Sequence, residues 1–153
     1  MKEFKGHVIY SGTYKGKAVV IHQGFNTLAS FQKSLMFKSS KKAIVSDQNN
    51  PDLFKKDITG VALCLPMTIG STTGGMVIET ASVRNLGPKA WLFSEPIDSL
   101  AASGIVLSRT WDNVPIIAID KLGPDFLNAV KTGDEIEVKE DGSVTKVEMK
   151  DEY

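Results

Sequence analysis

Short apolar runs separated by polar, turn-rich segments recur along the chain and predict an alternation of strands and helices. The clearest runs have the length of buried strands and lie at residues 60–65, 90–93 and 115–119. Residues 74–86 carry apolar side chains at helical spacing and end at Gly87-Pro88, a normal stop for a helix. The middle of the chain therefore predicts parallel strands with helices on one side of the sheet.

The two ends of the chain instead predict antiparallel strands. Residues 7–10 and 17–21 are apolar runs joined by a turn-rich segment, which is typical of a hairpin. Residues 135–139 and 143–148 alternate polar and apolar side chains around Glu140-Asp141-Gly142, a hairpin turn. These added strands would close the side of the sheet that the helices leave open.

Two segments are harder to assign. Serines and a threonine weaken the helical pattern between residues 25 and 37, so residues 30–37 also fit a strand or a loop. Residues 98–104 have the composition of one or two helical turns, which Gly104 would end. Residues 105–107 would then form a separate buried strand.

Composition narrows the possible functions. The chain has 153 residues, which predicts one domain over residues 1–153, and we expect the tail at 149–153 to fray. Its 18 basic and 18 acidic residues balance, which favours neither nucleic acid nor an anionic membrane as a partner. The N-terminus lacks a signal-peptide core, and no apolar run approaches the roughly 18 residues of a membrane span. We therefore expect a cytoplasmic protein.

The lone cysteine, Cys64, lies inside an apolar run and cannot form an internal disulfide. A buried reduced thiol of this kind is typical of the cytoplasm. His7 and His22 lie far from Cys64 in the sequence, so we expect no metal site in this chain.

The candidate site is the loop between the strand at residues 60–65 and the following helix. The strand stops at Pro66, and Gly70-Ser71-Thr72-Thr73-Gly74 leads into the helix. A strand, a small-residue loop and a helix start together direct backbone N–H groups and a helix dipole toward an anion. Ser71, at the apex, is the candidate for chemistry, although glycines also occur in such loops for backbone reasons alone.

Known motifs do not account for this loop. A P-loop would need a lysine, which is absent here, and a dinucleotide fingerprint would need a third glycine and a downstream acidic residue in the right places. A serine-hydrolase elbow would need glycine at positions 69 and 73, which are Ile and Thr. With these motifs excluded, the chemical feature left to explain is a serine hydroxyl beside a loop rich in backbone N–H groups.

A serine is a poor base on its own. Even a hydroxyl as acidic as that of tyrosine, with a pKa of about 10, would cost about 4 kcal/mol to ionise at pH 7. A helix N-terminus offers about 0.3–2 kcal/mol, and the loop contains no basic residue. The sequence therefore predicts a site that another polypeptide completes.

The chain resembles the aconitase X swivel-domain family, which includes small subunits of phosphomevalonate dehydratase and cis-3-hydroxyproline dehydratase. The resemblance extends over most of the length, at residues 13–17, 65–74, 87–90, 101–105, 114–117 and 130–138. It implies an α/β fold, a three-layer β/β/α swivelling domain similar to the fourth domain of aconitase. Its mixed sheet would be closed by antiparallel hairpins.

The resemblance also implies a function. The chain would be the small subunit of a hydro-lyase, a dehydratase that is active only with a large subunit carrying an iron–sulfur cluster. Ser71 would be the catalytic base that takes a proton from a small hydroxy acid. Gly70, Thr72, Thr73 and Gly74 would form the N–H-lined rim that binds the substrate, and this chain itself would bind no metal or other cofactor.

The sequence departs from the family pattern at Thr68-Ile69, where a glycine followed by a basic residue is common, and at Gly75, where a serine is common. The absence of a basic side chain at position 69 argues against a phosphorylated substrate and favours hydroxyproline-like or other small hydroxy acids. The missing serine removes a second hydroxyl from the substrate side, which Thr72 or Thr73 would replace.

One alternative is a non-catalytic ligand-binding or interaction module on the same fold. A phosphohistidine carrier is disfavoured, because neither His7 nor His22 stands at the start of the helix. Trp111, in a polar loop, is a candidate contact for the large subunit or, alternatively, an ordinary core or rim aromatic.

Overall fold

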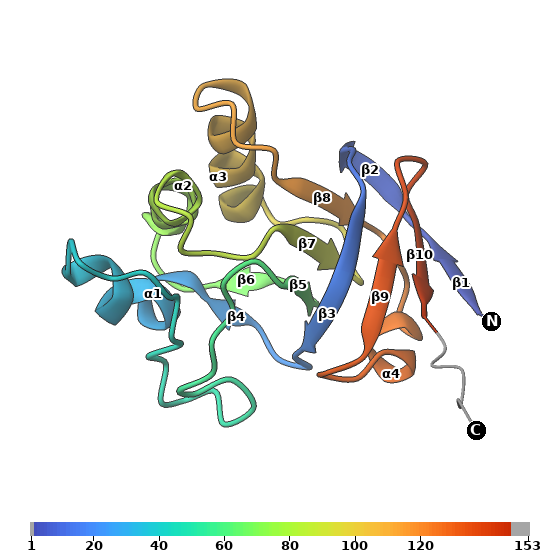
Figure 1. Cartoon of the computed structure of the whole chain (residues 1–153), viewed down its shortest axis with the longest axis horizontal. Helices are drawn as coiled ribbons and strands as arrows, with labels where there is room; N and C mark the ends of the chain where they lie inside the picture. Colours follow the sequence, from blue (N-terminus) through green and yellow to red (C-terminus); the bar gives the residue numbers. More distant parts are fainter. Residues whose placement is uncertain (1, 148–153) are drawn as a thin grey trace.

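The computed structural model describes residues 2–147, and its centre is an eight-stranded mixed sheet (Figure 1). The strands of this sheet are β1 (Glu3–Lys5), β2 (His7–Tyr10), β3 (Tyr14–Val20), β5 (Ala62–Leu65), β7 (Ala90–Phe93), β8 (Ile117–Asp120), β9 (Glu135–Val138) and β10 (Ser143–Lys146). They are ordered β1-β10-β9-β3-β5-β7-β8-β2. A separate parallel pair joins β4 (Phe25–Asn26) to β6 (Thr68–Ile69).

The middle of the sheet is parallel, as the alternating pattern predicts. β5 pairs with β3 on one side and with β7 on the other, and β7 pairs with β8. Every residue of β5, β7 and β8 is buried, because both faces of these strands are covered. Alternate side chains therefore enter two different cores.

Three helices cover one face of the sheet: α1 (Thr27–Met36), α2 (Gly74–Val83) and α3 (Ser99–Thr110) (Figure 1). The core beneath them is rich in aromatic side chains. Phe25 packs edge-on against Phe31 and Trp91, at ring-centroid distances of 5.6 and 5.8 Å. Such pairs each contribute about 0.5–1.5 kcal/mol beyond the burial of their area.

A second core fills the space between the parallel strands and the antiparallel strands β1, β9 and β10. It also includes α4 (Phe126–Ala129), where Phe126 packs edge-on against Phe4 at 5.4 Å. The two parts of the sheet thus enclose one core, and the helices form the third layer. This arrangement confirms the predicted β/β/α architecture with a mixed sheet.

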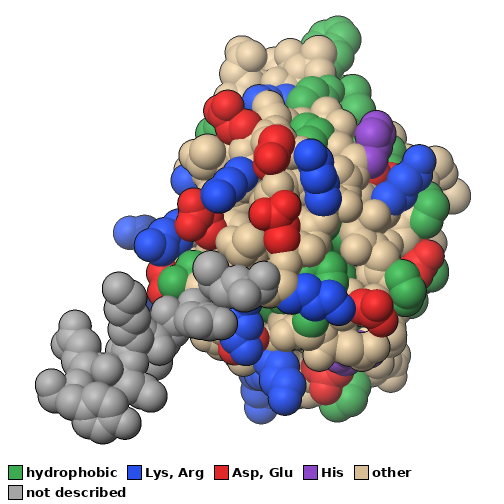
Figure 2. Space-filling view, turned by 90° about the vertical axis from the view of Figure 1, so that its right-hand side faces the viewer, with side chains coloured by type: hydrophobic (Ala, Val, Ile, Leu, Met, Phe, Trp, Pro, Cys, Tyr) green, Lys and Arg blue, Asp and Glu red, His purple; other side chains and the backbone are tan. Residues whose placement is uncertain are grey.

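The surface over β1, β9 and β10 carries both signs of charge. Figure 2 shows Lys and Arg side chains intermixed with Asp and Glu side chains on this face. No helix within residues 2–147 combines the length and the apolar character that crossing a membrane requires.

The predicted hairpin at the N-terminus is wrong, whereas the one near the C-terminus is confirmed. β2 pairs with β8, and β3 pairs with β5 and β9, so β2 and β3 are not neighbours. Between them Gly12 lies against Ile117 of β8, where an added Cβ would come within 2.6 Å of that side chain. β9 and β10 do form a hairpin, with Val144 opposite Val138. Glu148 and the tail at 149–153 lie outside the described residues.

The undecided segment before residue 37 is the helix α1. The Asn26 side chain accepts a hydrogen bond from the Ala29 N–H at 3.1 Å and so caps the first turn. Phe31, Ser30 and Ser34 form the buried face of this helix. The serines weaken the helical pattern in the sequence because they lie on the buried face, where apolar residues are usual.

The predicted helix stop at Gly104, followed by a strand, is also wrong, because α3 continues to Thr110. Gly104 lies where α3 meets α2. A Cβ at this position would overlap the carbonyl oxygen of Gly75 and lie 2.9 Å from the Ile78 Cβ. A Cβ at Gly75 would likewise overlap the Ser103 hydroxyl. Gly104 therefore allows close helix packing and does not end a helix.

We expect Gly104→Ala to lower the free energy of unfolding of the full chain by about 1–3 kcal/mol, because α2 and α3 would have to separate. Urea unfolding followed by circular dichroism measures this change. Gly87→Ala is the control, since the nearest atoms to its new Cβ would lie 3.7 Å away or farther. Equal stability of the two variants would contradict the packing role of Gly104.

Candidate functional site

Ser71 lies on the surface, in a tight loop that leads directly into α2. Its hydroxyl accepts a hydrogen bond from the Thr73 N–H at 3.2 Å and lies 2.9 Å from the Thr73 hydroxyl. Its carbonyl accepts the Gly74 N–H at 2.9 Å. The hydroxyl oxygen of Ser71 thus has two donor groups beside it, an arrangement that stabilises negative charge on that oxygen.

Two glycines of the loop are needed because α1 lies close to it. Gly70 has a φ of +110°, and a Cβ there would come within 2.8 Å of the Asn26 side-chain oxygen. A Cβ on Gly74 would come within 2.7 Å of the Thr27 hydroxyl. Both positions therefore require glycine for backbone and packing reasons, whatever the loop binds.

Three helices begin around this loop. Asn26 caps α1 and lies against Gly70, while α2 begins at Gly74. Asp98 caps α3 by accepting the Ala101 N–H, and it also binds Thr68, three residues before Ser71. The positive ends of three helix dipoles are thereby directed to one part of the surface.

The segments that frame Ser71 contain no lysine or arginine at residues 22–32, 66–78 and 94–103. They do carry exposed apolar side chains beside the loop, which we call the apolar rim: Leu28, Met67, Ile69 and Met76. The candidate site is thus an exposed hydroxyl with helix N-termini around it, a largely apolar border and no lysine or arginine in the three segments that frame it.

The predicted rim residues differ in their surroundings. Thr72 is exposed, and Thr73 contacts Ser71 through both its hydroxyl and its N–H. Gly74 is buried, and its N–H is engaged by Ser71. In this conformation the N–H groups of Thr73 and Gly74 are directed to Ser71 and not to a ligand, so their substrate-binding role stays a prediction.

The chain holds no ligand set for a metal cluster within residues 2–147, where no three His, Cys, Asp or Glu side chains come together. Cys64 is fully buried in β5, and burial raises the pKa of its thiol. A thiol in this position neither ligates a metal at the surface nor acts as a nucleophile. Residues 2–147 therefore do not by themselves form the ligand set of an iron–sulfur cluster.

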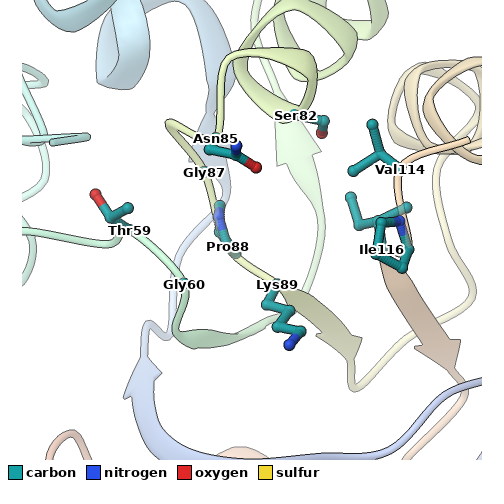
Figure 3. Close-up of a pocket in the computed structure, with 10 residues that line it drawn as sticks. Thr59, Gly60, Ser82, Asn85, Gly87, Pro88, Lys89, Val114 and Ile116 are labelled. Carbon is teal, nitrogen blue, oxygen red and sulfur yellow. The ribbon is translucent and has the colours of Figure 1, made fainter. Parts of the chain in front are cut away.

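A cavity of about 290 Å³ lies away from Ser71, near the starts of β5, β7 and β8. Lys89 and Ile116 directly precede β7 and β8, and Gly60 lies two residues before β5. Ser82 and Asn85 contribute from the end of α2 and the turn after it. Figure 3 shows the Asn85 side chain directed toward the space beside Val114 and Ile116. This cavity is separate from the loop, because Ser71 precedes α2 and the cavity lies where α2 ends.

Comparison with protein families identifies the family of the domain as a whole. The model of the aconitase X swivel domain matches residues 3–147, which include the whole of the Ser71 loop. The chain belongs to the aconitase X swivel-domain family. This match confirms the resemblance found in the sequence.

Individual members of this family and related structures are similar to the chain along nearly its whole length. The phosphomevalonate dehydratase small subunit of Methanothrix thermoacetophila is 30% identical over an alignment of 152 positions that covers 93% of this chain and 98% of that protein. The crystal structure of Thermococcus kodakaraensis aconitase X in its holo-form aligns with a TM-score of 0.79 at 25% identity, over 97% of this chain and all of that one. The solution structure of a UPF0107 protein, at 22% identity, shares the fold with a TM-score of 0.74, over 96% of this chain and all of that one.

The structure revises what the departure at Gly75 means for this member of the aconitase X swivel-domain family. A side chain at position 75 would point toward Ser103 and Gly104 of α3, not toward the Ser71 hydroxyl. A serine there would not place a second hydroxyl beside Ser71 in this structure. Ile69, in contrast, is exposed on the apolar rim, so its difference from a basic residue changes the charge of the site.

Sequence analysis assigned no role in the site to Asn26, Thr68 or Asp98, which hold the loop in place. Asn26 and Asp98 have a local signal, because each is a side-chain acceptor directly before a helix. That signal predicts a cap but not a contact with another segment. The contact of Asp98 with Thr68 depends on the tertiary fold.

Trp111 is 78% exposed at the end of α3, as expected for a surface contact. It lies 12 residues after Ser99, which corresponds to about 18 Å along a helix. Trp111 is therefore at the opposite end of α3 from the Ser71 loop, and its contact with a partner stays a prediction.

Glu79 of α2 lies next to Asp112, the residue after Trp111, and the hydrogen bond with the Asp112 side chain raises the pKa of Glu79.

We expect Cys64 in the folded chain to react with iodoacetamide at pH 8 at least roughly ten times more slowly than in urea, because burial disfavours the thiolate. Mass spectrometry of the alkylated protein measures the rate. A Ser39→Cys variant is the control, because its added thiol is exposed and should react without unfolding. Equally rapid reaction of Cys64 and the cysteine at position 39 would contradict the buried position.

Proposed function

We propose that this chain is the small subunit of a cytoplasmic dehydratase of the aconitase X type, with Ser71 as its catalytic base. The observation that carries the proposal is an exposed Ser71 hydroxyl at the place where three helices begin. Membership of the aconitase X swivel-domain family, and similarity to a protein named as a dehydratase small subunit, support the same assignment. The single buried thiol is consistent with a reducing compartment.

The energetics of Ser71 support a site shared with a large subunit. An unperturbed serine hydroxyl is far less acidic than that of tyrosine, so its ionisation at pH 7 costs well over about 4 kcal/mol. The N-termini of α1 and α2 together supply about 0.6–4 kcal/mol, whereas the Asp98 carboxylate already occupies the N-terminus of α3. The difference has to come from cations of a partner, since the segments that frame Ser71 lack lysine and arginine.

In the proposed reaction Ser71 takes a proton from the carbon next to the one that bears the leaving hydroxyl group. Before this step the Thr73 N–H and hydroxyl stabilise the negative charge of the deprotonated Ser71 oxygen, and the N-terminus of α2 adds to this effect; the transfer leaves Ser71 neutral, and the electron pair of the C–H bond forms the double bond as the hydroxyl group leaves. An iron–sulfur cluster bound by the large subunit would supply a Lewis acid for the leaving hydroxyl. The present chain contributes the hydroxyl, its donors and the backbone that holds them.

We infer that the substrate is a small hydroxy acid. The curated relative is named for phosphomevalonate, a phosphorylated substrate. In this chain Ile69 and its neighbours offer no cationic side chain for a phosphate, so any such group would be bound by the large subunit. A carboxylate near Ser71 would meet helix N-termini only, which favours substrates of low charge such as a hydroxyproline-like acid.

The large subunit is proposed to cover the apolar rim. Exposed apolar side chains that lie next to a functional polar group are typical of surfaces that a partner protein buries. The four side chains of the apolar rim lie next to Ser71 in this way. The rim carries no positive charge, which is complementary to a partner that brings cations to Ser71. Covering the rim would also exclude water and so strengthen those charge interactions.

We expect Ser71→Ala to lower the turnover number of the complex by about 10²–10⁴-fold, because the general base is lost. The chain is coexpressed with a candidate large subunit, and dehydration is followed over a panel of hydroxy acids. Ser39→Ala, at an exposed serine after α1, should retain full activity, and both variants should still form the complex. Full activity of the Ser71→Ala complex would exclude Ser71 as the base.

We expect Met76→Glu to raise the dissociation constant of the complex at least roughly tenfold, because it places a charge on the apolar rim where the large subunit would cover it. Met36→Glu is the matched control, since Met36 is 68% exposed and Met76 is 67% exposed. Met36 ends α1, about 14 Å along the helix from its start near the loop. Calorimetric titration measures both constants, and equal affinities would contradict docking at the apolar rim.

The alternative function, a non-catalytic binding module, has one observation in its favour. The cavity near Asn85 and Lys89 has a volume of about 290 Å³, enough for a small molecule. A chain that forms no complex, and supports no dehydration over the hydroxy-acid panel, would favour this alternative. Coexpression of the unmodified chain with the large subunit, followed by the hydroxy-acid panel, thus separates the two functions.

A further inference from the structure

The carboxylate of Asp98 has more bonds than a helix cap requires. One oxygen accepts the Thr68 N–H at 2.8 Å. The other accepts the Thr68 hydroxyl at 2.5 Å and the Ala101 N–H at 3.1 Å. A helix cap alone would use only the bond from Ala101.

Thr68 directs both of its donors to this carboxylate. It is 6% exposed and lies in β6, three residues before Ser71. Hydrogen bonds to an ionised carboxylate are shorter and stronger than those between neutral groups. The strand that leads into the Ser71 loop is therefore fixed to the start of α3 by a pair of charge-assisted bonds.

Asp98 is itself held from the other side. The Ile97 N–H donates to the Asp120 carboxylate at 2.9 Å, and Asp120 is 3% exposed at the end of β8. The other oxygen of Asp120 is 2.8 Å from the His7 Nδ1. The position of Asp98 is thus set by the central sheet through its neighbour, and Asp98 in turn sets the position of Thr68.

We propose that Asp98 and Thr68 are positioning residues for Ser71. The proposal rests on the proposed function of Ser71 as the base. Neither Asp98 nor Thr68 belongs to the loop that carries the hydroxyl, and both act on it through β6. Displacement of a reacting group by about 1 Å can lower a rate by about 10²-fold. Removal of the Thr68 hydroxyl should therefore slow the chemical step without weakening substrate binding.

The test uses the complex with the large subunit and compares Thr68→Val with Thr68→Ser. We expect Thr68→Val, which keeps the shape but removes the hydroxyl, to lower kcat by about 10–100-fold while KM stays within about twofold. Thr68→Ser retains the hydroxyl and should restore kcat to within about threefold of the original value. A purely structural role would not produce rescue by serine together with an unchanged KM.

Asp98→Asn provides a second variant. Asparagine still caps a helix, but its single side-chain oxygen cannot accept all the bonds that the carboxylate accepts. We expect the same loss of kcat as in Thr68→Val. Asp141→Asn is the control, because Asp141 accepts the Ser143 N–H in the distant turn between β9 and β10. Circular dichroism establishes that each variant is folded.

The outcomes distinguish this inference from the proposed function. Ser71→Ala is measured in the same assay, and full activity of that variant would remove the proposed function and this inference together. Loss of activity in Ser71→Ala, with a normal kcat in both Thr68→Val and Asp98→Asn, would overturn only the positioning role. If Thr68→Val does not fold, Asp98→Asn and Thr68→Ser still decide the question, because a normal kcat in Asp98→Asn would overturn it.

Discussion

Helices α2 and α3 touch through their backbones at Gly75 and Gly104, and the geometry around Ser71 depends on this contact. No Cβ fits at either position without a shift, so the two helices lie closer together than ordinary side chains allow. The start of α2 is thereby held beside the start of α3. This proximity is what lets Asp98, at the start of α3, contact Thr68 just ahead of the Ser71 loop.

The sequence predicts those parts of the fold whose signal is local. Continuous apolar runs mark β5 and β7 correctly, because these strands are covered on both faces. The hairpin of β9 and β10 follows from period-two alternation and its turn. The pairing of β2 with β8 was not predictable, since an apolar run indicates a strand but does not identify its neighbour. Gly104 shows the same limit, because a glycine that ends a helix and one that packs against Gly75 look alike in sequence.

The candidate site divides in a similar way. Ser71 and its glycines stand in consecutive positions between a strand and a helix, so the loop was visible in the sequence. Asn26 and Asp98, which hold that loop, come from segments that are distant in the sequence. The consequence of Gly75 also required the structure, because only the direction of its missing Cβ shows that a side chain there would face α3.

Helix N-termini provide N–H groups and partial positive charge without long cationic side chains, and the apolar rim borders the Ser71 loop. Such a surface is easily covered by another protein, whereas lysines or arginines would resist burial. The charge that Ser71 needs as a base is then strongest in the assembled state, where water is excluded and the effective dielectric is low. Under the proposed function, docking and activation of the serine are therefore one event, and the isolated small subunit keeps an inert hydroxyl.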